Sequence, residues 1–177
     1  MEEKKVSVAD LARMTIKEYI TNDNIINPIS IDQIKENVPE KAGIFVSIKK
    51  HGNLRGCIGT FMPTRKNIVE EVIANAIAAS TRDPRFNPVE INELSDLDVN
   101  VDVLSEPELV ENNDLSKLNP KIYGIILECQ GKRGLLLPDL EGVDTVEKQI
   151  EITRNKAWIT EPLDICNIYR FKVERYY

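Results

Sequence analysis

Apolar residues recur every three or four positions in two long stretches, and this spacing predicts helices over residues 7–21 and 67–81. The second helix has the broader apolar stripe, so we expect it to be well buried. It must end before Pro84, because proline disfavours helix in the residue before it. A third helix is predicted over residues 144–158, with Asp144 as its N-cap.

Alternation of apolar and polar residues predicts strands elsewhere in the chain. Residues 98–103 alternate cleanly, and residues 165–177 alternate again near the C-terminus. Two hairpins are also predicted, because paired apolar runs flank a glycine-containing turn. The first covers residues 42–61 around a turn at 51–53, and the second covers residues 123–137.

These elements add up to about six strands and three main helices. Hairpins and alternation, without regular strand–helix–strand units, indicate an α+β fold with a mostly antiparallel sheet. We treat residues 1–177 as one domain with a larger and a smaller lobe and a cleft between them. The polar segments 22–41 and 106–121 are the candidates for the smaller lobe.

Composition narrows the function classes. The 177 residues include 23 basic and 29 acidic side chains, and the net charge of −6 makes nucleic-acid binding an unfavoured function. No apolar run approaches the roughly 18 residues of a membrane span. Residues 1–6 are charged and lack the apolar segment of a signal peptide. Cys57, Cys129 and Cys166 are widely spaced, so we expect reduced thiols in a cytoplasmic protein and no metal site.

The most unusual stretch is Leu54-Arg55-Gly56-Cys57-Ile58-Gly59, in the second strand of the first hairpin. Alternation places Arg55 and Cys57 on one face, with glycines on either side of the cysteine. We interpret the glycines as leaving the thiol uncovered, and Arg55 as a cation that favours its thiolate form. Alternatively, Cys57 is a small buried apolar residue. His51 is the only histidine, and from the turn it is expected to lie too far away to serve as a base.

A second candidate group follows the second helix, in the loop Asp83-Pro84-Arg85-Phe86. If this loop returns to the hairpin, Arg55 and Arg85 converge and form a site for a carboxylate or phosphate. The structural alternative is that Arg55 or Arg85 pairs with Asp83 or a glutamate and holds the loop in place. Asp83 has a further alternative, a hydrogen bond to its own loop backbone.

These motifs, with Val103-Leu104-Ser105 and Gly134-Leu135-Leu136-Leu137-Pro138 in the same order, resemble one known family over residues 6–175. It is the domain family named after the AMME chromosomal-region candidate gene, also called AmmeMemoRadiSam system protein A. Trp158 stands where many members have a small residue. The resemblance implies an α+β fold with two subdomains. It also implies, as partners, a Memo-like protein of the extradiol dioxygenase type and a radical SAM protein, but no settled activity.

We therefore predict a site in which Cys57 and Arg55 are the catalytic candidates for a small or anionic ligand. The predicted binding residues are Leu54, Gly56, Ile58, Gly59, Asp83, Arg85 and Phe86. The alternative is a non-catalytic protein-binding or regulatory module whose hairpin docks a partner, and a nucleic-acid role ranks third. Substrate, cofactor and reaction class do not follow from these residues.

Overall fold

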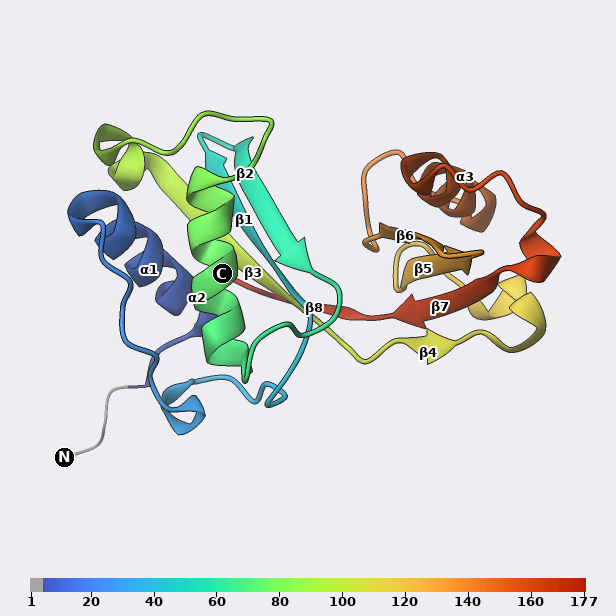
Figure 1. The fold of residues 1–177 in the computed structure, drawn as a ribbon, viewed down its shortest axis with the longest axis horizontal. Coiled ribbons are helices and arrows are strands. Elements are labelled where there is room, and N and C mark those ends of the chain that lie inside the picture. The colour runs from blue at the N-terminus through green and yellow to red at the C-terminus, as the bar shows by residue number, and fades with distance from the viewer. Residues whose placement is uncertain (1–4) are drawn as a thin grey trace. The chain divides into compact units, whose positions relative to one another are not determined.

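The computed structural model describes residues 5–177, and the chain forms two compact units (Figure 1). The first comprises residues 1–103 and 174–177, and the second comprises residues 104–173. Of the two polar segments, 106–121 belongs to the second unit and 22–41 to the first. Residues 1–4, which carry most of the charged N-terminus considered above, lie outside the described residues.

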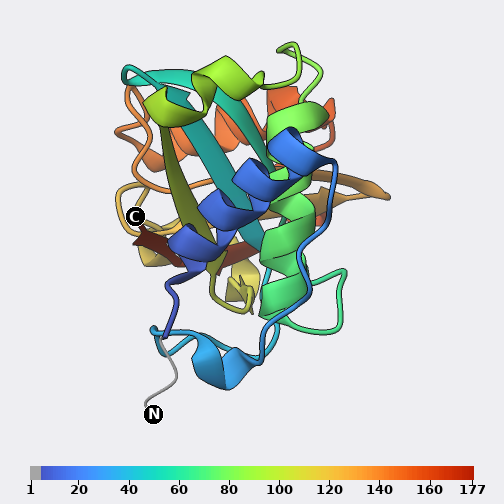
Figure 2. The same ribbon diagram turned by 90° about the vertical axis from the view of Figure 1, so that its left-hand side faces the viewer.

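The first unit is a four-stranded sheet with two helices on one face. Its strand order is β2-β1-β3-β8, and the pairings of β1 with β2 and with β3 are antiparallel. Figure 2 shows α1 and α2 lying across the same face of this sheet. The bounds are α1 Val8–Asn22, β1 Ile44–Lys50, β2 Asn53–Thr60, α2 Ile68–Thr81, β3 Leu97–Leu104 and β8 Val173–Tyr176.

Both helices of this unit form where the apolar spacing predicts them, and side chains cap their N-termini. The hydroxyl of Ser7 accepts a hydrogen bond from the Asp10 amide at 2.9 Å, and the Asn67 side chain accepts one from the Glu70 amide at 2.9 Å. The apolar faces of the helices and the inward residues of the sheet make one core. Its fully buried members include Val8, Leu11, Ile44, Val46, Ile48, Ile68, Val72, Ala76 and Val101.

The second unit is a four-stranded sheet in the order β4-β7-β5-β6, with α3 packed against β5 and β6 (Figure 1). The pairings of β4 with β7, of β5 with β6 and of β5 with β7 are antiparallel. Its core centres on Ile125, Leu127, Ile150 and Ile168. The bounds are β4 Glu108–Leu109, β5 Gly124–Cys129, β6 Lys132–Leu136, α3 Val146–Ala157 and β7 Asn167–Phe171.

Five short 3₁₀ helices connect the larger elements within the described residues. They are η1 Ile31–Gln33, η2 Ile91–Asp96, η3 Glu111–Asn113, η4 Leu115–Lys117 and η5 Leu163–Ile165. A capping box of Ser30 and Gln33 marks the start of η1. In the part of the chain that the structure describes, no helix has the length and apolar character needed to cross a membrane.

The α+β class, the three main helices and the antiparallel pairing are confirmed. The strands differ in detail: the described residues form eight strands in two sheets of four. The predicted strand over 165–177 is two strands separated at Lys172, and β7 belongs to the second sheet while β8 belongs to the first. The N-cap of α3 is Thr145, whose side chain accepts from the Lys148 amide at 3.1 Å, and not Asp144.

The expectation of three reduced thiols is wrong for two of the cysteines. Cys129 and Cys166 form a disulfide, and Cys57 is the free cysteine among the described residues. Spacing along the chain could not show this pairing, because the two residues are 37 positions apart and meet only when β5 pairs with β7. The disulfide ties the end of β5 to the residue before β7.

We expect this disulfide to stabilise the fold by restricting the unfolded chain. Replacing both residues, in Cys129→Ala/Cys166→Ala, should lower the free energy of unfolding by about 2–4 kcal/mol. Urea unfolding with and without dithiothreitol measures this loss. The reductant should destabilise the natural chain and the Cys57→Ser control, but not the double variant. Equal effects of the reductant on all three would contradict the assignment.

Candidate functional site

The motif 54–59 lies on β2, the outermost strand of the first sheet. Cys57 is opposite Ser47 on β1, and Ser47 is opposite Asn100 on β3. Gly56 faces α2, so Cys57, the next residue along the strand, points to the sheet face away from that helix. The thiol is therefore not sealed beneath α2.

The glycines of the motif serve packing, which corrects our interpretation that they uncover the cysteine. A Cβ on Gly56 would collide with the backbone oxygen of Ala79 in α2, and a Cβ on Gly59 would collide with the Ile44 backbone and the Phe45 ring. Any larger residue at position 56 would force α2 away from the sheet. Glycine here marks the close approach of a second backbone.

The loop after α2 does return to the hairpin, and it closes the open edge of β2 at Cys57. The backbone amide of Cys57 donates to Asp83 Oδ2 at 2.8 Å, and its carbonyl accepts from Arg85 Nη2 at 3.3 Å. Nε and Nη2 of Arg85 also donate to the two carboxylate oxygens of Asp83, at 2.9 and 2.7 Å. A carboxylate and a guanidinium thus satisfy backbone groups that an exposed edge strand would leave open. We call these three residues the edge clip.

Arg55 is held by a second set of contacts, farther along the same loop. Its guanidinium donates to both oxygens of Glu93, at 3.0 and 2.8 Å, and to the carbonyls of Asn87 and Pro88, at 2.8 and 3.1 Å. Lys50 also reaches Glu93, at 3.0 Å. The structural alternative is confirmed for both arginines: Arg85 pairs with Asp83, and Arg55 pairs with a glutamate.

These hydrogen bonds shift the pKa values of the carboxylates and guanidinium groups that make them. The Arg85 guanidinium, with the Cys57 amide, holds the pKa of the buried Asp83 carboxyl far below its usual range. Hydrogen bonds from Arg55 and from the Glu90 amide lower the pKa of Glu93 to about 2. The same contacts raise the pKa of Arg55 and of Arg85. All four groups are therefore charged at neutral pH.

Cys57 itself is a free, half-buried thiol. The hydroxyl of Ser47 donates to its sulfur at 3.2 Å. Arg55, two residues away on the same strand, and Arg85 in the loop after α2 are both engaged with carboxylates and carbonyls. His51 is exposed and faces Asp96, with Nε2 and Oδ2 3.8 Å apart, as its position in the turn suggested. Within the described residues, the thiol thus has the Ser47 hydroxyl as a hydrogen-bond partner, whereas His51 faces Asp96.

The remaining predicted binding residues lie at different depths. Leu54 is 42% exposed at the start of β2, and Phe86 is half-buried beneath the Arg85 guanidinium, 5.5 Å from the ring centre. Ile58 is half-buried and packs against the core of the first unit. Leu54 is therefore the exposed apolar side chain among the predicted binding residues.

Sequence reasoning missed Glu71, whose side chain is 1% exposed in the first turn of α2. Its carboxylate accepts from the hydroxyls of Thr60 and Thr64, at 2.7 and 2.9 Å, and from the amides of Thr64 and Arg65, at 2.7 and 2.8 Å. Burial alone would raise its pKa, but these hydrogen bonds lower it. Glu71 thereby fixes the loop between β2 and α2. The one sequence signal for this role was the position of Glu71 in the first turn of a predicted helix, where an acidic side chain is favoured.

The polar positions of β3 are also more buried than their alternation implied. Asp102 is 1% exposed and accepts from Nε and Nη2 of Arg175 on β8, at 2.6 and 2.8 Å. Asn100 is 8% exposed and lies in register with Ser47. The sheet face that carries Cys57 is therefore a row of paired polar groups. Among the described residues there is no group of three or more side chains that could hold a metal ion.

Comparison with known proteins decides the family. The AMMECR1 family model matches residues 9–176. The chain belongs to the AMMECR1 family. This confirms the resemblance found in the sequence.

The relatives extend this result to a solved structure. A Thermotoga maritima protein is 51% identical over 167 residues, which cover 91% of each chain. A Clostridium acetobutylicum protein is 46% identical over 99% of this chain but only 36% of its own length. The crystal structure of an uncharacterised Pyrococcus horikoshii protein has a TM-score of 0.80 at 33% identity, covering 95% of this chain and 88% of that one.

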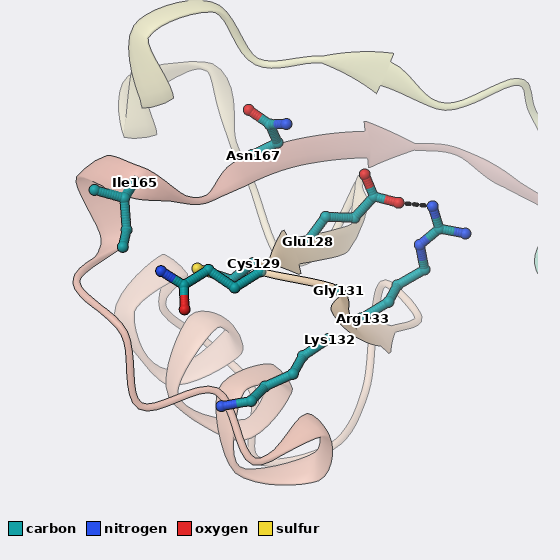
Figure 3. A pocket seen from close by; sticks show the side chains of 8 residues that line it. Glu128, Cys129, Gly131, Lys132, Arg133, Ile165 and Asn167 are labelled. Carbon is teal, nitrogen blue, oxygen red and sulfur yellow. Dashed lines mark ion pairs between the residues drawn. The ribbon is translucent and has the colours of Figure 1, made fainter.

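This AMMECR1 chain also has a hollow of about 470 Å³ in its second unit (Figure 3). Arg133 points toward Glu128 and pairs with it, while Lys132 points away and pairs with Glu161 at 2.7 Å. The basic groups of this hollow are thus already neutralised. Its lining residues are Glu128, Cys129, Gln130, Gly131, Lys132, Arg133, Ile165 and Asn167.

We expect the fold of this AMMECR1 domain to be acid-sensitive. The pKa values of Glu71, Asp83 and Glu93 are lower in the folded chain than in the unfolded chain, so the folded chain binds fewer protons. Their stabilisation is present above the ordinary glutamate pKa of 4.5 and is lost as pH falls toward about 2, where Glu93 protonates.

Urea unfolding at several pH values between 7 and 2.5 measures this decline. Glu93→Gln should be less stable at pH 7 and should show a shallower decline than the natural chain. Lys121→Gln, which removes an exposed cation in the second unit, should keep the natural slope. An unchanged slope for Glu93→Gln would contradict the role given to its carboxylate.

Proposed function

We propose that this chain is a non-catalytic component that works with a Memo-like protein of the extradiol dioxygenase type and a radical SAM protein. In this proposal the hairpin of β1 and β2 is a fixed surface for a partner. The main support for this proposal is that Arg55 pairs with Glu93 and Arg85 pairs with Asp83. The charged side chains that a catalytic thiol would need hold the chain's own loop.

The lengths of the relatives support work beside another protein. The matched segment spans nearly all of this chain but 36% of the Clostridium acetobutylicum relative. In that protein, a domain of this kind is therefore covalently joined to a larger amount of other polypeptide. Covalent joining raises the effective concentration of two modules that act on one another.

The surface offered to such a partner is held rigidly. The edge clip fixes the middle of β2, Arg55 fixes the loop beside it, and Glu71 fixes the loop that follows it. Leu54 projects from the start of this strand, and Met62, 47% exposed, follows its end. A surface that does not reorganise on binding loses little conformational entropy.

We expect Leu54→Asp to weaken binding to the Memo-like or radical SAM protein of the same organism by about tenfold or more, because it puts a charge into an apolar contact. Cys57→Ser should bind within about twofold of the natural chain. Isothermal titration calorimetry with the purified proteins measures both, and thermal unfolding checks that each variant is folded.

Ile122→Asp, at an exposed position in the second unit, is the matched control and should bind normally. If Ile122→Asp weakens binding and Leu54→Asp does not, the hairpin is not the docking surface. If neither natural protein binds the chain, the proposed partnership is wrong.

One observation favours a second candidate, a thiol nucleophile. Cys57 is free and half-buried, and the Ser47 hydroxyl donates to its sulfur at 3.2 Å. A free, partly accessible sulfur with a hydroxyl at hydrogen-bond distance is an arrangement expected around a thiol nucleophile.

If Cys57 is a nucleophile, its alkylation by iodoacetamide at pH 7 should be faster in the folded chain than in urea. Ser47→Ala should then slow the reaction of the folded chain. Mass spectrometry of the labelled peptide resolves Cys57 from the disulfide-bonded cysteines. Alkylation no faster in the folded chain than in urea excludes the nucleophile and leaves the binding module.

A further inference from the structure

A second hollow of about 620 Å³ lies in the first unit, between the end of α1 and the segment that leads into η2. We call it the α1–η2 groove. It is separate in sequence from the motif 54–59. Its lining residues are Tyr19, Ile20, Asp23, Val89, Glu90, Ile91 and Asn92.

One wall of the groove is fixed by the same contacts that engage Arg55. Arg55 bonds to the carbonyls of Asn87 and Pro88 and to Glu93, which bracket the lining segment 89–92 on both sides. Between these contacts, the Val89 amide donates to the Ser80 carbonyl in α2 at 2.8 Å. The wall is therefore preformed, and its shape depends on a residue of the family motif.

The floor and one rim of the groove are apolar. Val89 is buried at its base, Tyr19 and Ile20 are half-buried, and Ile91 is 62% exposed. Ile25, just past the end of α1, is also largely exposed. A concave apolar surface with exposed isoleucines beside it is typical of a site that another molecule covers.

The rest of the rim is negatively charged. Asp23 and Glu90 are both exposed and line the groove. Among residues 5–177 neither forms a salt bridge, although Glu90 also interacts electrostatically with the Arg55 guanidinium. The last turn of α1 contains no basic residue, so nothing within that turn offsets the partial negative charge of its carbonyls. The charge of this rim is therefore complementary to a cation that sits next to an apolar group.

We propose that the α1–η2 groove binds a segment of a partner protein in which an aliphatic side chain stands directly beside a lysine or arginine. The aliphatic group fills the hollow over Val89, and the cation meets Asp23 and the carbonyl end of α1. This goes beyond the proposed function, because it assigns a second surface and states the chemistry that the surface recognises. Arg55 is then a positioning residue for this groove.

Two blocked dipeptides test the chemistry without any partner protein. Acetyl-Leu-Lys-amide and acetyl-Leu-Glu-amide are titrated separately into the full chain labelled with ¹⁵N, and amide shifts are followed by NMR. We expect Leu-Lys to shift the amides of Ile20, Ile91 and Asn92, with an affinity at least about fivefold above that of Leu-Glu. Acetyl-Gly-Lys-amide, which lacks the aliphatic group, should bind more weakly than Leu-Lys.

Single substitutions test separately the apolar and the acidic side chains of the α1–η2 groove. Ile91→Asp should abolish the Leu-Lys response, while the matched exposed control Ile122→Asp in the second unit should keep it. Asp23→Asn, which suits the left-handed backbone at that position, should reduce the preference for Leu-Lys over Leu-Glu.

Equal binding of Leu-Lys and Leu-Glu, shifts confined to residues outside the groove, or a natural response in Ile91→Asp would each overturn the proposal. Because the Memo-like and radical SAM proteins are absent from this test, its failure leaves the proposed function standing. Conversely, a failure of those proteins to bind leaves the groove standing.

Discussion

The first unit depends on how the exposed edge of β2 is closed. The Asp83 carboxylate accepts the Cys57 amide, and Arg85 holds that carboxylate while donating to the Cys57 carbonyl. An ionised carboxylate buried to 4% exposure is stable only with such partners. The clip both protects an edge strand and sets where the chain goes after α2.

Other residues of the motif 54–59 act together with this edge clip. Gly56 lets α2 approach the sheet closely, which brings the end of α2 and Asp83 within reach of β2. The chain then continues past Asn87 and Pro88 to η2, where Arg55 and Lys50 hold Glu93. A single strand thus positions α2, the loop after it and η2.

This arrangement changes our interpretation of the motif 54–59. A cation, a thiol and glycines on one strand suggest a reactive centre when only their order is known. In the structure the cations pair with a buried carboxylate, Asp83, and a half-buried one, Glu93, and the glycines make room for neighbouring backbone. The motif therefore builds a rigid surface. The surfaces that we propose for recognition are the apolar residues along the hairpin and the α1–η2 groove, and these internal contacts hold both in place.

We could predict from the sequence the α+β class, the three main helices, the two hairpins and the family. These features are predictable because each depends on residues that lie close together in the sequence: apolar periodicity, turn residues and short motifs. The sequence also allowed for the pairing of Arg55 and Arg85 with carboxylates, although it could not identify Glu93 as the partner of Arg55.

Contacts between residues that are distant in sequence became known only from the three-dimensional fold. The Cys129–Cys166 disulfide, the closure of β2 by Asp83, the Gly56 contact with Ala79 and the α1–η2 groove each join segments that lie far apart in the chain. Periodicity shows which face of an element is apolar, but not which element will cover it. That choice is made by packing and by the pairing of buried charges, which depend on three-dimensional proximity.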